Sequence, residues 1–399
     1  MPTTKIRSTS TSAAHEVDST RAWVVVASAF LAMFTVFGVA YSFGEFFGPM
    51  ADEFGTSRSA TALFFSITTF AYFAIGIISG RIADRIGPRR VMVFGAVAMV
   101  SGLLLTAEVS SIRLGYLTYG LGVGIGVACC YVPMVAAVGG WFEQRRTFAL
   151  GLAVAGIGTG TLVLVPIIER LIEANGWRDA YRVLAAVSGV SLVIAAVGAH
   201  RPPGSAAAPR PIREIIRGRR DFWFLYASSL FLAAALFTPF VFMADYIDTT
   251  EASGSAAVLL GLIGMASIIG RLGLGALAGR VGIVGLYRLS SLGLGLSFLI
   301  WIVADANYAL LIAFAIVLGV SYGGIIALSP AVVAQLFGTI GMGGVLGALY
   351  TANGLGGLIG PPTMGQIIDS SGHTAAQWTA LASGLLGTAL LYRLKPQAG

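Results

Sequence analysis

Apolar runs of about 20 residues recur along this chain of 399 residues, with short polar segments between them. An α-helix needs about 20 apolar residues to cross the hydrocarbon core of a bilayer. Strands of a membrane β-barrel would instead appear as runs of about ten alternating residues, a pattern this sequence lacks. The sequence therefore predicts an all-α membrane protein with twelve spanning helices, over 23–47, 58–80, 91–109, 114–139, 147–170, 178–199, 222–246, 254–278, 284–303, 307–330, 341–366 and 375–393.

The composition agrees with a surface that faces lipid. Only 11% of the residues are charged, 56% are apolar, and the mean hydropathy is +0.85, whereas soluble domains carry about 25% charged residues. The net charge of +7 could suggest a nucleic-acid partner. However, the basic residues form short clusters between the apolar runs, which is typical of membrane topology. We expect membrane lipid around the protein, no nucleic-acid partner, and a monomer.

The basic residues also predict the orientation in the membrane. Segments that follow the even-numbered runs are basic, whereas those that follow the odd-numbered runs are poorer in basic residues and more acidic. Because loops rich in lysine and arginine stay in the cytoplasm, both termini are predicted to be cytoplasmic, in a cell (inner) membrane. The basic positions include Arg81, Arg85, Arg89, Arg90, Arg145, Arg146, Arg280 and Arg288.

A Pro-rich, basic segment divides the predicted helices six and six. We expect a disordered cytoplasmic tail over 1–20, one six-helix half over 21–199, a cytoplasmic linker over 200–221, a second half over 222–394, and a tail over 395–399. Two such halves are the plan of many transporters, in which the substrate site lies between the halves. Three positions recur 195 residues later, which supports a repeat: Gly80, Phe142 and Pro166 reappear as Gly275, Phe337 and Pro361.

The segment 80–90, GRIADRIGPRR, joins the second and third predicted helices. It resembles the loop signature of the major facilitator superfamily, and 275–282 is a degenerate copy in which Gly279 replaces the acid. The resemblance implies the major facilitator fold of two pseudo-symmetric six-helix halves. It also implies that the loop gates conformational change and does not bind substrate. The residues assigned to this gating loop are Gly80, Asp84, Arg85, Gly87, Arg89 and Arg90.

Further stretches resemble the monocarboxylate transporter family. They are 18–26, 124–133, 141–153, 176–181 and 270–275, and the stretch 141–153, WFEQRRTFALGLA, is the most specific. The resemblance implies secondary active transport of a small organic anion, a monocarboxylate such as lactate or pyruvate. Six helices would rock against six by alternating access, with proton symport as the expected coupling because the membrane potential opposes anion entry.

Arg271 stands out even without the family. It lies eight residues before Gly279, about 12 Å along a helix that rises 1.5 Å per residue, and a cation at that depth needs a water-filled cavity or a partner. Its helical neighbours Gly264, Ser267 and Gly275 are small, as a cavity wall would be. Arg271 could clamp a carboxylate, the role that the resemblance implies, or it could bond backbone carbonyls as a structural arginine.

Two departures from the family pattern bear on proton coupling. Ser267 stands where better-known members have an aspartate, and Tyr41 stands where animal members have a lysine. Glu45, one turn beyond Tyr41, is the leading replacement, because a partly desolvated glutamate binds protons more readily. Asp245 is the second candidate. Either acid could instead be an ordinary group near the outer surface.

Other polar groups inside the predicted helices could bond substrate or a neighbouring helix. The candidates for substrate binding beside Arg271, Tyr41 and Ser267 are Tyr119, Tyr131, Tyr322, Tyr350 and Asn353. No enzyme motif or Walker loop is present, so neither catalysis nor a cofactor is expected. The three histidines, His15, His200 and His373, are far apart in sequence, which argues against a metal site.

Three alternatives to carboxylate transport stay open. An exporter of drugs or hydrophobic compounds would keep its activity without Arg271. A membrane sensor on the same fold would bind ligand without transporting it. A sugar symporter would be expected to use several carboxylates and amides rather than one arginine.

Overall fold

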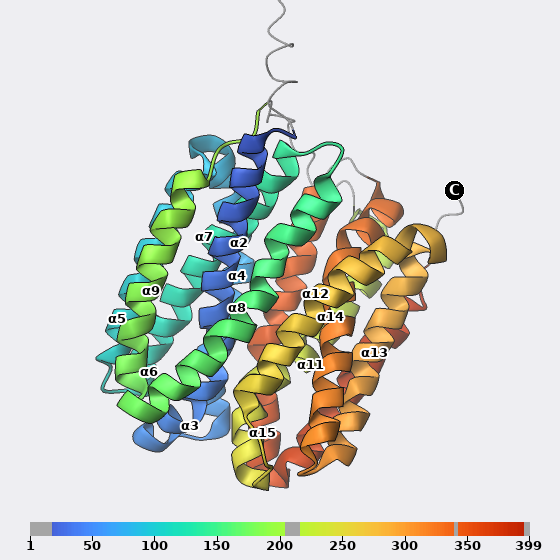
Figure 1. Cartoon of the computed structure of the whole chain (residues 1–399). Helices are drawn as coiled ribbons and strands as arrows, with labels where there is room; N and C mark the ends of the chain where they lie inside the picture. The colour runs from blue at the N-terminus through green and yellow to red at the C-terminus, as the bar shows by residue number, and fades with distance from the viewer. Residues whose placement is uncertain (1–17, 204–215, 339–341, 395–399) are drawn as a thin grey trace, which may run out of the picture.

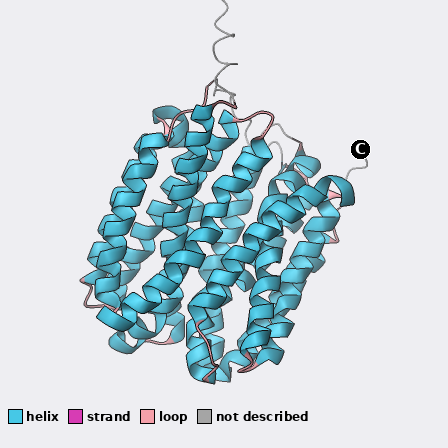
Figure 2. Ribbon diagram, viewed as in Figure 1, coloured by secondary structure: helices cyan, strands magenta, loops and turns pink. Residues whose placement is uncertain are grey.

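The computed structural model describes residues 18–203, 216–338 and 342–394. These residues form helices and connecting loops and no strand (Figure 2), as the apolar runs predict. The predicted tails lie outside the described residues except for positions 18–20, and so does 204–215 of the predicted linker. The helices run roughly side by side along one direction (Figure 1).

The helices before the linker pack mainly against one another, and we call them the N-terminal helix group. Ser57 caps one of them, because its hydroxyl accepts a hydrogen bond from the Ala60 amide. The members are α2 (Thr20–Tyr41), α3 (Phe43–Phe54), α4 (Arg58–Ile86), α5 (Pro88–Ala107), α6 (Ile112–Gly115), η1 (Tyr116–Leu121), α7 (Gly122–Trp141), α8 (Arg146–Asn175) and α9 (Trp177–Gly198).

The helices after the linker form the C-terminal helix group. Ser255 and Asn307 cap two of them, because their side-chain oxygens accept hydrogen bonds from backbone amides of the first turn. The members are α11 (Arg220–Thr250), α12 (Ala256–Val281), α13 (Ile283–Ala304), α14 (Tyr308–Phe337) and α15 (Met342–Leu391). The two groups contact each other chiefly through α4 with α15 and α8 with α12.

Ten helical segments in the described part of the chain are long and apolar enough to cross a membrane. Apolar side chains on their outer faces are exposed, such as Phe94, Val97 and Val303, which suits contact with lipid. α15 is not among the ten, although it is 50 residues long. Gly372 divides it, with φ 81° and ψ 172°, a conformation open to glycine and costly for other residues. This break falls between the predicted helices 341–366 and 375–393.

Two predicted helices are interrupted in the structure. The first, 23–47, is divided at Ser42 into α2 and α3, where the Ser42 hydroxyl donates to the Val39 carbonyl over 2.8 Å. The fourth, 114–139, begins as α6 and contains the π-helical turn η1 before α7. Periodicity in a sequence does not reveal such breaks, because the apolar character continues through them.

Candidate functional site

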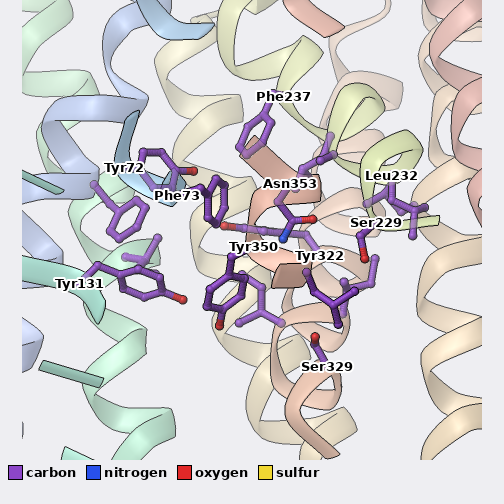
Figure 3. A pocket seen from close by; sticks show the side chains of 18 of the residues that line it. Tyr72, Phe73, Tyr131, Ser229, Leu232, Phe237, Tyr322, Ser329, Tyr350 and Asn353 are labelled. Carbon is purple, nitrogen blue, oxygen red and sulfur yellow. The ribbon is translucent and has the colours of Figure 1, made fainter. Parts of the chain in front are cut away.

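A pocket lies between the two helix groups. It holds about 840 Å³ of empty space, including the part that opens to solvent. Figure 3 shows Tyr72, Phe73 and Tyr131 on one side of it and Ser229 and Leu232 on the other. Helices of both groups supply its lining: Phe37, Tyr41, Tyr72, Phe73, Tyr131, Ile157, Ser229, Leu232, Ala233, Leu236, Phe237, Tyr287, Leu294, Tyr322, Ile325, Ile326, Ser329, Leu349, Tyr350 and Asn353.

The structure brings five of the predicted substrate-binding residues together in this pocket, namely Tyr41, Tyr131, Tyr322, Tyr350 and Asn353. Two others take part in helix packing instead. The Tyr119 hydroxyl donates to the Val39 carbonyl over 3.3 Å, and the Ser267 hydroxyl donates to the Gly264 carbonyl over 2.7 Å. Both side chains are fully buried outside the pocket lining.

Arg271 lies beside the pocket, behind one of its walls. The side chain is only 5% exposed, and its guanidinium carbon lies 5.6 Å from the centre of the Tyr322 ring. Nη1 donates to the Val154 carbonyl of α8 over 2.6 Å. Nε and Nη2 are buried and have no hydrogen-bond partner among the described residues. Leaving buried charged donors unpaired is costly, so these two nitrogens are candidates for binding an anion.

A hydrogen bond between two tyrosines joins the helix groups next to Arg271. The hydroxyls of Tyr41 on α2 and Tyr322 on α14 lie 3.1 Å apart. The Tyr41 ring also packs against Phe240 of α11, with 4.4 Å between the ring centres. Movement of one group relative to the other would separate these hydroxyls, which could then donate to a ligand.

Sequence reasoning missed several residues of the pocket. Tyr72 and Tyr287 are tyrosines inside predicted helices, so the criterion that selected Tyr131 would have selected them too. Ser229 and Ser329 could have been found in the same way. Phe73 carried no such signal, because an apolar side chain in a membrane helix looks the same whether it faces a pocket or lipid.

The two acidic candidates have different surroundings. Glu45 lies on α3, and its Oε1 atom is buried with no hydrogen-bond partner in the described part of the chain. Asp245 is paired instead. Its Oδ2 atom lies 2.8 Å from Nε of Arg58 and 3.1 Å from Nε2 of His373.

Arg58 also contacts Asp369, with 3.3 Å between Nη1 and Oδ1. Arg58 begins α4, whereas Asp245, Asp369 and His373 belong to the C-terminal helix group. We call these four residues the outer ionic cluster, because they lie at the predicted outer ends of their helices. The cluster joins the two groups at the end opposite to the start of α2 (Figure 1).

The predicted gating loop forms a tight connection between α4 and α5. Gly87 ends α4 with its amide donating to the Ala83 carbonyl over 2.8 Å, and Pro88 begins α5. Gly80 packs against Val132 of α7. The charged members, Asp84, Arg85, Arg89 and Arg90, are exposed, away from the pocket.

Lipid-facing helices in two groups around a shared pocket define a membrane transport protein that crosses the bilayer several times. Comparison with known families identifies it further. Residues 27–361 match the model of the Major Facilitator Superfamily. Since this match covers most of the chain, the protein belongs to the Major Facilitator Superfamily, and within it is related to the monocarboxylate transporters.

Three relatives illustrate that relation. The chain is 31% identical to monocarboxylate transporter 3 of Rattus norvegicus, over 87% of this chain and 74% of the relative. It is 29% identical to monocarboxylate transporter 11 of Homo sapiens, over 94% of this chain and 83% of the relative. It is 30% identical to monocarboxylate transporter 13 of Rattus norvegicus, over 93% of this chain and 88% of the relative.

A solved structure has the same fold. It is the crystal structure of a bacterial homologue of the human lysosomal transporter Spinster, in an inward-facing and unoccupied conformation. The TM-score is 0.70, and the alignment covers 94% of this chain and 97% of that one. At 15% sequence identity, the likeness concerns the fold alone.

Proposed function

We propose that this protein is a secondary active transporter that moves a small organic anion, a monocarboxylate, across the cell membrane by alternating access. The relation to monocarboxylate transporters supports the substrate class. The pocket between two helix groups supports the mechanism, because transporters built from two halves bind substrate where the halves meet.

Twelve spanning helices in two pseudo-symmetric halves are part of this proposal. Ten segments qualify by length and composition, and the two parts of α15 on either side of Gly372 would complete the twelve. Gly87 and Gly282, 195 positions apart, end α4 and α12 with similar backbone angles, φ 92° and ψ 149° against φ 98° and ψ 130°. Such agreement at equivalent helix ends supports a structural repeat.

The orientation follows from the basic loops. The start of α2 and the end of α15 lie at the same end of the bundle as the α4–α5 connection (Figure 1), and Arg85, Arg89 and Arg90 are exposed on that connection. Positively charged loops stay in the cytoplasm, which supports cytoplasmic termini. The domain limits 21–199 and 222–394 are proposed with this topology, since they agree with the end of α9 and the start of α11.

The buried guanidinium of Arg271 is the observation that carries the proposal. Two of its nitrogens are unpaired, and its neighbour Tyr322 lines the pocket. A carboxylate that enters from the pocket could accept hydrogen bonds from both nitrogens, and such charge-assisted hydrogen bonds are among the strongest in proteins. Tyr41 and Tyr322 could add hydroxyl donors once they separate, and Tyr131, Tyr350 and Asn353 would contact the rest of the molecule.

Coupling to protons would make transport of an anion electrically neutral. Moving one negative charge into a cell against 100 mV costs about 2.3 kcal/mol, which a co-transported proton removes. Glu45 is the preferred proton carrier, because its carboxylate has a buried, unpaired oxygen. Asp245 ranks below it, since Asp245 pairs with Arg58 and His373.

The direct test is uptake of labelled lactate and pyruvate into proteoliposomes, with and without an inward proton gradient. Wild-type protein should accumulate label when the gradient is present. Arg271→Ala should reduce uptake by about 100-fold or more, because it removes a charge-assisted pair. Arg280→Gln is the matched control, since Arg280 is exposed on the last turn of the same helix.

Equal uptake by wild type and Arg271→Ala would reject the role of Arg271. Absence of lactate and pyruvate uptake under every gradient would reject these two substrates. Transport of labelled apolar cations by the same proteoliposomes would then favour the exporter alternative.

A further inference from the structure

We infer that the pocket selects a monocarboxylate that carries an aromatic ring, such as an aryl-substituted 2-hydroxy acid, over lactate. This inference rests on the proposed function, and it concerns the part of the substrate that lies away from the carboxylate.

One wall of the pocket is a continuous row of aromatic rings, which we call the aromatic wall. It consists of Tyr131, Phe37, Tyr72, Phe73 and Tyr350, which come from α7, α2, α4 and α15. The centres of successive rings in this order are 5.2, 5.8, 4.3 and 5.7 Å apart. Ring pairs attract each other at centre separations of about 4.5–7 Å in offset-stacked or edge-to-face geometry, and three of these four separations lie in that range. The row can therefore accept a further ring with the same kind of contact.

The rest of the pocket lining combines aliphatic side chains and a few hydroxyl groups with the rings of Tyr41, Phe237, Tyr287 and Tyr322. Leu232, Leu236 and Ser229 line it from α11, and Ile326 and Ser329 line it from α14. Figure 3 shows Ser229 and Leu232 across the pocket from Tyr72 and Phe73, with Asn353 between them. A flat ring between them could contact the aromatic wall on one side and the methyl groups of Leu232 on the other. The amide of Asn353 and the two serines could bond a substituent of that ring.

A three-carbon acid uses little of this surface. Lactate offers one methyl group, so with its carboxylate at Arg271 it would leave most of the aromatic wall without a partner. Affinity grows with the apolar area that a ligand buries, and paired rings add to it. An aryl group on the same 2-hydroxy acid should therefore strengthen binding by about tenfold or more.

The experiment measures inhibition of labelled lactate uptake in proteoliposomes by unlabelled acids. The probes are 3-phenyllactate, 3-cyclohexyllactate, which has the same carbon skeleton without an aromatic face, and phenethylamine, which has a ring without a carboxylate. We expect 3-phenyllactate to inhibit at a concentration at least tenfold below that of unlabelled lactate and about threefold below that of 3-cyclohexyllactate. Phenethylamine should not inhibit. Labelled 3-phenyllactate should itself be taken up.

Phe73→Leu tests the wall directly. Leucine keeps an apolar side chain but removes the ring, so inhibition by 3-phenyllactate, measured relative to inhibition by unlabelled lactate in the same variant, should weaken about fivefold. Phe94→Leu is the matched control, because Phe94 is 62% exposed on the outer face of α5. Stabilisation of the purified variants by 3-phenyllactate against heat gives a second readout that does not depend on transport.

The outcomes separate the inference from the function on which it rests. Lactate uptake that 3-phenyllactate inhibits no better than unlabelled lactate would overturn the inference alone. Equal inhibition by the phenyl and cyclohexyl acids, or no effect of Phe73→Leu on either readout, would also overturn it. Absence of uptake and of thermal stabilisation for both acids would overturn the proposed carboxylate transport as well.

Discussion

At the scale of single residues, Arg271 and Glu45 each have buried side-chain atoms that lack a hydrogen-bond partner in the described part of the chain. Arg271 lies in the C-terminal helix group, and Glu45 lies in the N-terminal helix group. A buried carboxylate favours its neutral form because low polarity penalises the charge. The two residues could therefore have separate roles in transport, in which Arg271 binds the anion and Glu45 carries a proton.

Glu45→Gln tests this division of roles. Glutamine keeps the size of the side chain but cannot exchange a proton, so an inward proton gradient should no longer drive accumulation of the labelled acid. Gradient-driven uptake should fall about tenfold or more, whereas exchange of labelled for unlabelled acid at equal pH should persist, since exchange needs no net proton movement. Both rates are measured in proteoliposomes.

Glu108→Gln is the control for that variant, because Glu108 is exposed and pairs with Arg182. Undiminished gradient-driven accumulation in Glu45→Gln would exclude Glu45 as the carrier. Asp245 would not then become the preferred proton carrier, since it pairs with Arg58 and His373 in the outer ionic cluster.

At the scale of helices, glycine allows the two groups to approach closely. A Cβ atom on Gly158 of α8 would lie 2.2 Å from the Gly264 carbonyl oxygen of α12. Small residues at such crossings are typical of membrane helices, which associate through close packing rather than through the hydrophobic effect. The small face of α12 that includes Gly264 and Ser267 therefore packs against α8 and α14.

Gly158→Ala should destabilise the protein by about 1–3 kcal/mol, because an added methyl group must push two backbones apart. Gly273→Ala is the matched control on α12, since a Cβ atom there meets nothing within 4 Å. Thermal unfolding in detergent compares the two, and we expect a lower midpoint for Gly158→Ala only. Equal midpoints would mean that the crossing is loose enough to accept a methyl group.

At the scale of the whole molecule, the outer ionic cluster holds the two helix groups together at one end. Arg58 contacts Asp245 and Asp369 across the interface. Alternating access requires these contacts to break whenever the pocket opens toward that end. The cluster should therefore set part of the balance between the two conformations.

Arg58→Gln should shift the population toward the state that is open at the outer end. Spin labels at positions 57 and 251, in a background with Cys129 and Cys130 replaced by alanine, would report the distance between the groups. We expect a larger fraction of long distances in the variant, by about threefold or more, which corresponds to loss of a partly buried pair.

Arg178→Gln is the control, because Arg178 pairs with Glu53 inside the N-terminal helix group, with 2.5 Å between Nη1 and Oε2. It should leave the distance distribution unchanged. An unchanged distribution in Arg58→Gln would show that the cluster does not restrain opening.

The sequence was most informative where one residue type had one physical meaning. Repeated apolar runs predicted membrane helices because an unpaired backbone group is too costly in lipid. The segment 80–90 and the stretch 141–153 predicted the family, which the comparisons confirm. Arg271 was identified because a cation inside an apolar run needs a water-filled cavity or a partner. Two of its nitrogens have no hydrogen-bond partner among the described residues, so they are available to a ligand.

The tertiary structure decided which residues share a site. Tyr119 and Tyr131 look alike in sequence, yet only Tyr131 lines the pocket, because helix rotation sets which face of a span meets the interface. Phe73 and Phe94 are both phenylalanines in apolar runs, but one joins the aromatic wall and the other faces outward. Nor could the sequence show that Asp245 meets Arg58, 187 positions away. Apolar patterning determines that a helix lies in the membrane, whereas contacts between distant helices determine what each side chain meets there.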